Sequence, residues 1–245
     1  MTRISIVTVV LNDKHGLFKT LESLSNISKA SYEHVIIDGG STDGSLDVVK
    51  DFSNRIDVVV SENDNGIYDA MNKGVLNATG NVICFLNAGD RVLNGYISYP
   101  TNCFSTDNNI DYCYAGVILH GNKKDKLYIP REINPTSEYL QAMPFPHPGL
   151  FVKKELFDRI GYFDLSKKIT ADHEWIVRVL LSKVRGVRIR HGVVKFNLDG
   201  LSLSSNTSFE MYQTAVKYGR SKYKAVFYYL YNLLVFVKYK IISKI

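Results

Sequence analysis

Four short apolar segments alternate with stretches of helical spacing in the first 90 residues, and this order constrains the fold more than any other feature. Ile4–Val10 is β-branched and nearly continuous, which is typical of a strand covered on both faces of a parallel sheet. Further strands are expected at His34–Asp38, Ile56–Val60 and Val82–Leu86. Because the helical stretches between them have short connections, the segment predicts an open, doubly wound α/β sheet.

Beyond residue 90 the pattern is less regular, and we expect shorter elements there. These are strands at Asp111–Leu119, Leu150–Val152, Val187–Arg190 and Val193–Leu198, helices at Lys153–Ile160 and Asp172–Leu181, and one or two helices at Ser208–Ser243. A length of 245 residues suits one domain or one domain with an appendage. We expect residues 1–98 and 99–207 to form the two halves of that domain and residues 208–245 to form a helical tail.

The net charge of +6 is concentrated in the tail. Residues 211–245 contain seven basic and no acidic side chains, so residues 1–210 carry 23 basic and 24 acidic ones. This distribution does not match a nucleic-acid-binding protein, in which basic side chains form a stripe with spaced aromatic residues. Three cysteines are too few for a disulfide scaffold and have no metal-ligand spacing, which indicates a reducing compartment.

Each of the four expected strands ends in a polar cluster. The clusters are Asn12-Asp13, Asp38-Gly39-Gly40-Ser41, Glu62-Asn63-Asp64-Asn65 and Asn87-Ala88-Gly89-Asp90. Ligands of open α/β sheets bind outside the carboxyl ends of the strands, so four clusters at one edge predict a binding site. The phosphate loops GxGxxG and GxxxxGK[ST] are absent, which disfavours a dinucleotide-binding enzyme and a P-loop NTPase.

An anionic ligand at this acidic, amide-rich edge would need a cation. Carboxylate and amide oxygens suit Mg²⁺ or Mn²⁺, and Asp90 is the natural ligand because it directly follows an apolar strand. A solvated turn at Asn87–Asp90 is the alternative.

The motifs SIVTVVLN, VIIDGGSTDGS, SENDNGIYDAMNKGVLNATG and ICFLNAGD occur in this order over residues 4–90. PFPHPGLFVKKELFDRIGYFD, ADHEW and KFNLDGLS follow them. The ordered set closely resembles family 2 glycosyltransferases, in particular the bacterial enzymes that build surface polysaccharides such as O-antigen. The resemblance implies a GT-A fold, which is a Rossmann-like open mixed sheet with helices on both faces, here extended by the basic, aromatic tail.

The resemblance also implies roles for individual residues at the sheet edge. Thr8 and Asn12 match first-strand residues that line the nucleotide pocket, and Asp38 resembles the acid that hydrogen-bonds uracil. The stretch that closes over the base and ribose is matched by Asp64, Asn65 and Asn72. The last acid of the DxD-like signature, which binds Mn²⁺ or Mg²⁺, is matched by Asp90. Gly89 stands where many relatives carry another Asp, which leaves Asp90 and Asn87 near the metal.

Asp172, in ADHEW, resembles the catalytic base of the family. A sugar hydroxyl is a poor nucleophile, and a carboxylate within hydrogen-bond reach can accept its proton during attack on the anomeric carbon. Attack opposite the leaving UDP inverts the configuration, while the cation neutralises charge on the diphosphate. The alternative is that Asp172 is only the N-cap of the expected helix.

Three further residues are candidates for the acceptor side of the site. His147 lies between two prolines and resembles a position near the acceptor or the metal, with a structural histidine as the alternative. Glu174 would face the acceptor, but it is also four residues before Arg178, as in a surface ion pair. Trp175 would stack on the acceptor sugar, with burial in the core as the alternative.

The resulting hypothesis is an inverting, metal-assisted transferase that moves a sugar from a UDP-sugar to a glycan or lipid-linked oligosaccharide. A sugar nucleotidyltransferase is one alternative, although its glycine-rich basic loop is missing after the first strand, where the sequence is LNDKHG. A non-catalytic nucleotide-sugar-binding protein is the other alternative, and the presence of both Asp90 and Asp172 argues against it.

The tail contains the apolar and aromatic segment Ala225–Val237, with lysines on both sides. Thirteen helical residues span about 20 Å, which is short of a hydrocarbon core of about 30 Å. Tyrosine-rich, lysine-flanked segments suit the headgroup interface of a membrane. Two arrangements are open: a cytoplasmic protein attached peripherally to the inner face of the plasma membrane, or a tail packed on the catalytic domain or in a homodimer.

Overall fold

The computed structural model describes residues 2–120, 125–133, 140, 142–197 and 205–242, with the side chains of all except 197, 205 and 235–242. The described strands are β1 (Ile4–Val10), β2 (Tyr32–Asp38), β3 (Val58–Ser61), β4 (Val82–Phe85), β5 (Arg91–Val92), β6 (Tyr112–His120), β7 (Lys126–Tyr128), β8 (Leu150–Lys153) and β9 (Gly186–Asn197). The described α-helices are α1 (Lys14–Leu24), α2 (Ser45–Asp51), α3 (Ile67–Asn77), α4 (Ser98–Thr106), α5 (Glu155–Ile160), α6 (Ala171–Leu181), α7 (Ser205–Lys217) and α8 (Lys222–Ile242).

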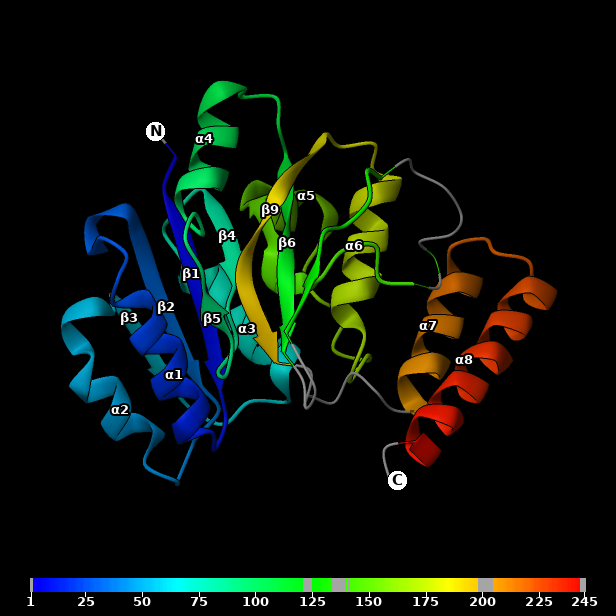
Figure 1. Cartoon of the computed structure of the whole chain (residues 1–245), viewed down its shortest axis with the longest axis horizontal. Coiled ribbons are helices and arrows are strands. Elements are labelled where there is room, and N and C mark those ends of the chain that lie inside the picture. Colours follow the sequence, from blue (N-terminus) through cyan, green and yellow to red (C-terminus); the bar gives the residue numbers. More distant parts are fainter. Residues whose placement is uncertain (1, 121–124, 134–139, 141, 198–204, 243–245) are drawn as a thin grey trace.

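These strands form one open mixed sheet in the order β3-β2-β1-β4-β8-β6-β9-β5, with β7 paired to β6 (Figure 1). The first four are parallel, as expected from the sequence. β8 is antiparallel to both β4 and β6, and β9 is parallel to β6. The carboxyl ends of β1 to β4 therefore lie at one edge of the sheet, and their loops gather there.

Helices cover both faces of the sheet. Because successive residues of β1 point to opposite faces, its side chains pack against both layers. Val7 and Val9 belong to the core formed with α3, α5 and α6. Ile4 and Ile6 face the α4 side, and Val10 packs with α1 and α2. The α7–α8 hairpin lies outside this sandwich, next to α6 (Figure 1).

The structure differs from the sequence-based expectation in the second half. The prediction of two separate strands at Val187–Arg190 and Val193–Leu198 is wrong, because the single strand β9 runs from Gly186 to Asn197. Its pairing with β6 shifts register beside Gly116, so Arg190 and His191 form a bulge instead of a turn. The sequence analysis also missed β5, β7 and α4, which are short or weakly patterned.

Gly74 allows α3 to pack directly on β1. A Cβ atom at this position would lie 2.2 Å from Cγ1 of Val7. We expect Gly74→Ala to lower the free energy of unfolding by about 1–3 kcal/mol through overpacking. This loss should appear although alanine favours a helix over glycine by about 1 kcal/mol.

Urea unfolding measures the effect, and Leu76→Ala on the exposed side of the same helix is the control. The control should change stability little. A Gly74→Ala protein as stable as the wild type would contradict the close contact between α3 and β1.

Candidate active site

The side chain of Asn12 joins the loops that follow β1 and β2. Its Oδ1 accepts a hydrogen bond from the N–H of Thr42 at 2.8 Å, and its own N–H donates to Ser41 Oγ at 2.8 Å. Asn12 has a φ of +50°, a left-handed conformation that asparagine tolerates better than most residues. The two loops are therefore fixed side by side at the carboxyl edge.

Asp38 is the last residue of β2 and is fully buried. Its carboxylate accepts hydrogen bonds from the N–H groups of Gly40 at 3.2 Å and Ser41 at 3.1 Å. Ser61, the last residue of β3, donates its hydroxyl to the same carboxylate at 2.7 Å. Asp38 therefore organises the turn after β2 and ties it to the end of β3.

Asp64 and Asn65 lie in the loop between β3 and α3. Asp64 Oδ1 accepts a hydrogen bond from the N–H of Gly66 at 2.8 Å, and a Cβ atom at Gly39 would lie 2.4 Å from Asp64 Oδ2. Asn65 donates its N–H to the Asp69 carboxylate at 2.9 Å. The structure therefore brings the loops after β1, β2 and β3 together. Asp64 occupies the space that a side chain at Gly39 would fill.

The turn Asn87–Asp90 after β4 is held by Thr20, a buried residue of α1. The Thr20 hydroxyl donates to the carbonyl of Asp90 at 2.8 Å and accepts from the N–H of Gly89 at 3.0 Å. Gly89 has a φ of +96°, a conformation that L residues rarely adopt. This turn conformation therefore suits glycine at position 89.

The side chains of Asn87 and Asp90 provide oxygen atoms suited to a divalent cation. The Asp90 side chain is almost completely buried, and within the described chain no hydrogen-bond partner reaches the buried Oδ1 of Asn87. The described residues hold no group of three or more His, Cys, Asp or Glu side chains that could bind a metal ion. Mg²⁺ commonly takes one or two carboxylates, with substrate phosphates and water completing its shell. Asp90 and Asn87 fit that mode of binding.

Two of the predicted nucleotide-binding residues make contacts inside the protein. Thr8 is fully buried on the α1 side of the sheet, 3.0 Å from His34 Nε2. Asn72 of α3 makes two hydrogen bonds with the backbone of Phe163. Its Nδ2 donates to the Phe163 carbonyl at 3.1 Å, and its Oδ1 accepts from the Phe163 N–H at 3.0 Å. Both polar ends of the Asn72 amide are therefore used to connect the two halves of the domain.

Asp172 lies in the first turn of α6 and contacts α3 through Tyr68. Its Oδ1 accepts hydrogen bonds from the Tyr68 hydroxyl at 2.9 Å and from the N–H of His173 at 2.8 Å. The N-cap of α6 is Thr170, so the alternative in which Asp172 is the N-cap is wrong. Tyr68 thus connects the candidate base to the helix that follows the Asp64 loop.

His147 lies beside the end of β4 and close to Asp172. Its ring stacks on Phe85, with 5.0 Å between ring centroids. Burial lowers the pKa of His147, and the negative charge of Asp172 opposes this shift only in part. The imidazole is therefore neutral at neutral pH, next to the candidate base.

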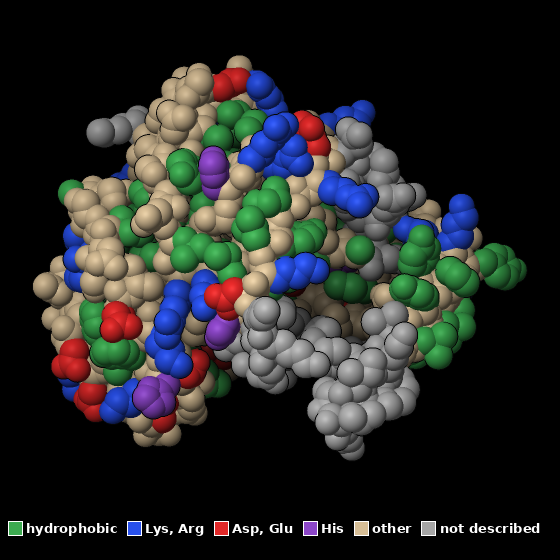
Figure 2. Space-filling model, in the orientation of Figure 1, with side chains coloured by type: hydrophobic (Ala, Val, Ile, Leu, Met, Phe, Trp, Pro, Cys, Tyr) green, Lys and Arg blue, Asp and Glu red, His purple; other side chains and the backbone are tan. Residues whose placement is uncertain are grey.

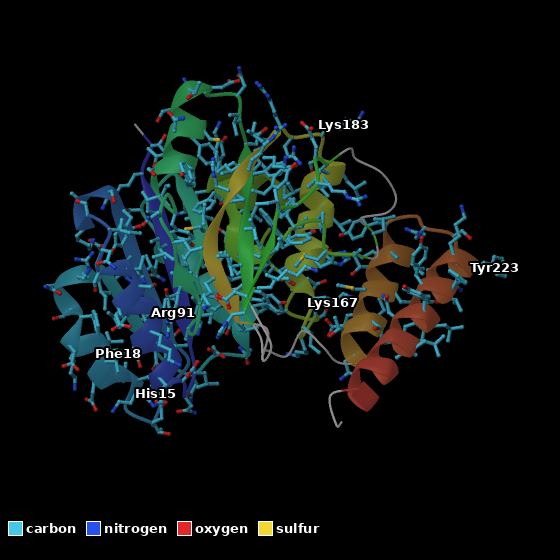
Figure 3. All side chains as sticks on the ribbon, in the orientation of Figure 1. His15, Phe18, Arg91, Lys167, Lys183 and Tyr223 are labelled. Carbon is cyan, nitrogen blue, oxygen red and sulfur yellow. The ribbon has the colours of Figure 1, made fainter. Side chains whose placement is uncertain are left out.

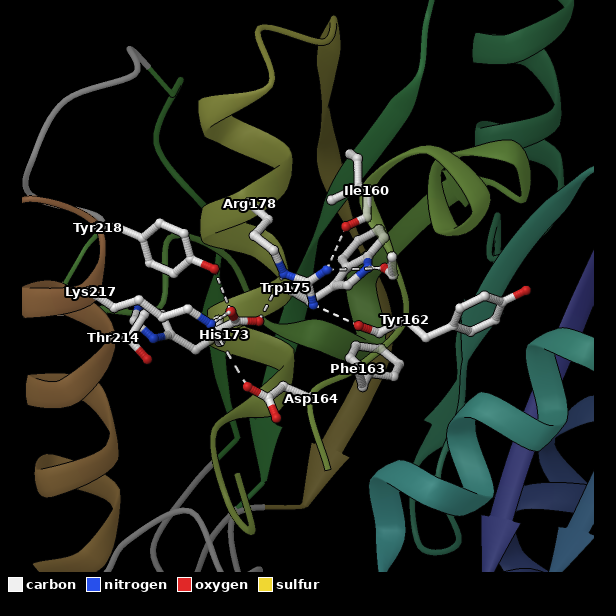
Figure 4. A network of polar contacts seen from close by, with 12 residues as sticks. Ile160, Tyr162, Phe163, Asp164, His173, Trp175, Arg178, Thr214, Lys217 and Tyr218 are labelled. Carbon is white, nitrogen blue, oxygen red and sulfur yellow. Dashed lines mark hydrogen bonds and ion pairs between the residues drawn. The ribbon is translucent and has the colours of Figure 1, made fainter. Parts of the chain in front are cut away.

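Glu174 and Trp175 are placed away from any surface that an acceptor could reach, since each side chain is about 1% exposed. Figure 4 shows Arg178, Lys217 and Tyr218 in a polar network between α6 and α7, and Glu174 is the partner that these three side chains share. Its carboxylate accepts hydrogen bonds from Arg178 Nε at 2.9 Å, Lys217 Nζ at 2.9 Å and the Tyr218 hydroxyl. Burial would raise the pKa of Glu174, but these donors outweigh it and lower the pKa below its usual value.

Glu174 is therefore buried and its partner Arg178 is only 18% exposed, so the expectation of a surface ion pair is wrong. Trp175 stacks on Phe157 with 4.5 Å between centroids and donates Nε1–H to the carbonyl of Gly161 at 2.7 Å. Its burial supports the core alternative over stacking on an acceptor sugar.

Glu210 of α7 caps the start of α6. Its carboxylate accepts hydrogen bonds from the N–H groups of Lys168, Ile169 and Thr170 at 2.9–3.0 Å and from the Thr170 hydroxyl at 3.0 Å. Lys167, labelled in Figure 3, also donates to the Glu210 carbonyl at 3.1 Å. The tail therefore holds the backbone that leads into the Asp172 helix, including the N–H of its N-cap residue Thr170.

Sequence reasoning missed three residues that position the site, namely Thr20, Tyr68 and Glu210. Thr20 is a polar residue within the apolar stripe of its helix, which was a usable signal. Glu210 is the last acidic residue before the all-basic tail, but nothing in the sequence identifies its backbone partners. Tyr68 lies within a motif that the resemblance covers, and its contact with Asp172 depends on the tertiary fold.

We expect Glu210→Gln to lower the free energy of unfolding at neutral pH by about 1–3 kcal/mol, because a charged acceptor of several N–H groups is lost. Burial would raise the pKa of Glu210, but the hydrogen bonds at residues 168–170 lower it overall. Its stabilisation is therefore present above the unfolded-state pKa of about 4.3 and disappears as pH falls through the folded-state pKa.

Chemical unfolding of wild type and variant between neutral and acidic pH measures this difference. Glu22→Gln, at an exposed position of α1, is the matched control and should show no comparable pH dependence. A Glu210→Gln difference that stayed constant as pH fell would contradict the role of the charged cap.

Known proteins resemble this chain in sequence and in fold. The family model described as "Glycosyl transferase family 2" matches residues 5–168. A PGL/p-HBAD biosynthesis glycosyltransferase of Mycobacterium bovis is 28% identical over 202 residues, which cover 78% of this chain and 74% of that protein. An uncharacterized glycosyltransferase of Haemophilus influenzae is 26% identical over 254 residues, which cover 98% of this chain and 99% of that protein.

Two solved structures show the same fold at low sequence identity. The structure of S. aureus TarS 1-349 in complex with UDP has a TM-score of 0.71 and 14% identity, covering 94% of this chain and 70% of that one. The mannosyltransferase PcManGT from Pyrobaculum calidifontis, in complex with GDP-Man and Mn²⁺, has a TM-score of 0.68 and 15% identity, covering 93% and 70%. The mixed sheet therefore has a GT-A fold. Because the family model matches most of the chain, the protein belongs to glycosyltransferase family 2.

Proposed function

We propose that the protein is an inverting glycosyltransferase that moves a sugar from a UDP-sugar to a glycan or lipid-linked oligosaccharide in surface-polysaccharide synthesis. The family and the curated relatives support transfer of a sugar. The complexes of TarS with UDP and of PcManGT with GDP-Man support a nucleotide-sugar donor. The choice of uridine rests on Asp38 at the end of β2.

The donor would lie across the loops after β1, β2 and β3. Asn12 and Asp64 belong to loops that approach the Asp38 turn closely, through the contacts at Thr42 and Gly39. Amide and carboxylate oxygens there can accept hydrogen bonds from the base and the ribose hydroxyls. Asn65 and Asn72 would contribute less directly, by holding the Asp64 loop and α3.

Asp90 and Asn87 would hold Mn²⁺ or Mg²⁺ together with the donor diphosphate. When bound, the cation neutralises the charge that develops on the leaving diphosphate. Thr20 would keep the Asn87–Asp90 turn in position through its hydrogen bonds to Gly89 and Asp90.

Asp172 would act as general base on the acceptor hydroxyl. As the acceptor oxygen bonds to the anomeric carbon, its proton passes to the Asp172 carboxylate and the bond to the UDP oxygen breaks, which inverts the configuration. His147 would border the acceptor pocket as a neutral ring. Glu174 and Trp175 would support the pocket from behind, since both are buried.

The observation that carries this proposal is the hydrogen bond between Tyr68 and Asp172 at 2.9 Å. Tyr68 lies in the first turn of the helix that follows the Asp64 loop, whereas Asp172 lies 104 residues later, in the first turn of α6. The fold therefore ties the candidate base to the candidate donor site, as transfer between two substrates requires.

We expect Asp172→Asn to lower kcat by about 10²–10⁴-fold, because general-base assistance is typically worth this much. Donor affinity should change little, since the amide keeps the size of the side chain. Steady-state kinetics and UDP titration separate the two effects. Asp51→Asn, at an exposed position of α2, is the control, and near-normal turnover in Asp172→Asn would exclude Asp172 as the base.

We expect UDP with Mn²⁺ to raise the melting temperature by about 5–10 °C, because a ligand at about 100 times its Kd adds about 2.7 kcal/mol. GDP and ADP should shift it less, and Asp90→Ala should abolish the Mn²⁺-dependent part.

Differential scanning fluorimetry with each nucleotide, with and without Mn²⁺, measures these shifts. Asp47→Ala, at an exposed position of α2, is the control and should retain the full shift. A shift that persists undiminished in Asp90→Ala would show that Asp90 does not hold the cation.

A further inference from the structure

The outer face of α8 carries a continuous stripe of exposed apolar and aromatic side chains. Its described members are Tyr223, Val226, Phe227, Leu230, Tyr231 and Leu234. Their spacing of three and four residues places them on one side of the helix. Tyr223 is 90% exposed, Leu234 70% and Phe227 66%. Figure 2 shows hydrophobic side chains gathered over α8, and Figure 3 shows Tyr223 pointing away from the protein.

The opposite face of α8 is already used by α7. Ala225 is fully buried there, in a small core that includes Tyr212. Tyr229 contacts the rings of Phe209 and Tyr212, with centroids 6.2 and 5.8 Å apart. Because α7 in turn is tied to α6 through Glu174 and Glu210, the hairpin holds α8 with its apolar stripe outward.

The charge around this stripe has one sign. Residues 211–245 contain seven basic and no acidic residues, and Lys222 and Lys224 are exposed beside Tyr223. A second copy of this chain docked on the stripe would bring two strongly basic tails together, which is unfavourable. An anionic lipid surface would instead complement these charges and receive the tyrosine rings at headgroup level.

Among the described residues, no helix is long and apolar enough to cross a membrane.

We propose that the outer face of α8 binds the headgroup region of a membrane that contains anionic lipids. The helix would lie in the plane of the interface, because α7 packs against its inner face at Ala225 and Tyr229. Apolar side chains of the stripe would enter the interface while the lysines contact lipid phosphates.

Co-sedimentation of the full chain with lipid vesicles tests this proposal. We expect binding to vesicles with equal parts phosphatidylglycerol and phosphatidylcholine, and much weaker binding to phosphatidylcholine alone or at high salt. The variant Phe227→Ser/Leu230→Ser should bind the anionic vesicles about a hundredfold more weakly, because loss of each large apolar side chain from the interface lowers the affinity about tenfold. Lys222→Glu/Lys224→Glu should weaken binding by at least about tenfold.

Leu76→Ser, a similarly exposed leucine on α3, and Lys19→Glu, an exposed lysine on α1, are the matched controls and should bind like the wild type. Circular dichroism and melting temperature establish that each variant is folded. Failure of the wild type to bind anionic vesicles, or equal binding by the Phe227→Ser/Leu230→Ser variant, would overturn the proposal. A wild-type dimer in analytical ultracentrifugation that this variant dissociates would also overturn it, in favour of a second copy as the occupant.

Discussion

The parallel pairing of β1 with β2 and β4 is the constraint on which the site depends. The register places Val10 opposite Asp38 and Val7 opposite Phe85, so each strand delivers its following loop to the same edge. Side chains at this edge then connect neighbouring strands and loops to one another. Asn12 holds Thr42, and Asp38 holds the hydroxyl of Ser61. The strand order therefore brings together the loops of the candidate donor site.

The candidate base Asp172 and the start of its helix are held by contacts from two directions. Tyr68 of α3 donates to the Asp172 carboxylate, and Glu210 of α7 accepts from the backbone that leads into α6. The tail is therefore part of the support of the candidate base as well as an outward-facing surface. Both contacts join segments distant in sequence, so they form only once the sheet and the hairpin are assembled.

The sequence predicts the first half of this fold well, because buried parallel strands are apolar throughout and their helices have a clear period. It predicts less of the second half. The bulge at Arg190 and His191 resembles a turn when only composition is read, and the register shift that explains it is a tertiary feature. For the candidate site, the sequence locates the loops and the carboxylates, but their support depends on partners such as Thr20 and Glu210. Burial of Glu174 and Trp175 also depends on the docking of α7 and could not be read from spacing.

The most direct test of the account is a crystal structure of the protein with UDP and Mn²⁺. We expect the uracil ring beside Asp38 and Asn12, the metal bound by Asp90 and both phosphates, and the Asp172 carboxylate facing the open side of the diphosphate. Nucleotide bound away from the loops after β1, β2 and β3, or a metal that Asp90 does not contact, would contradict the account.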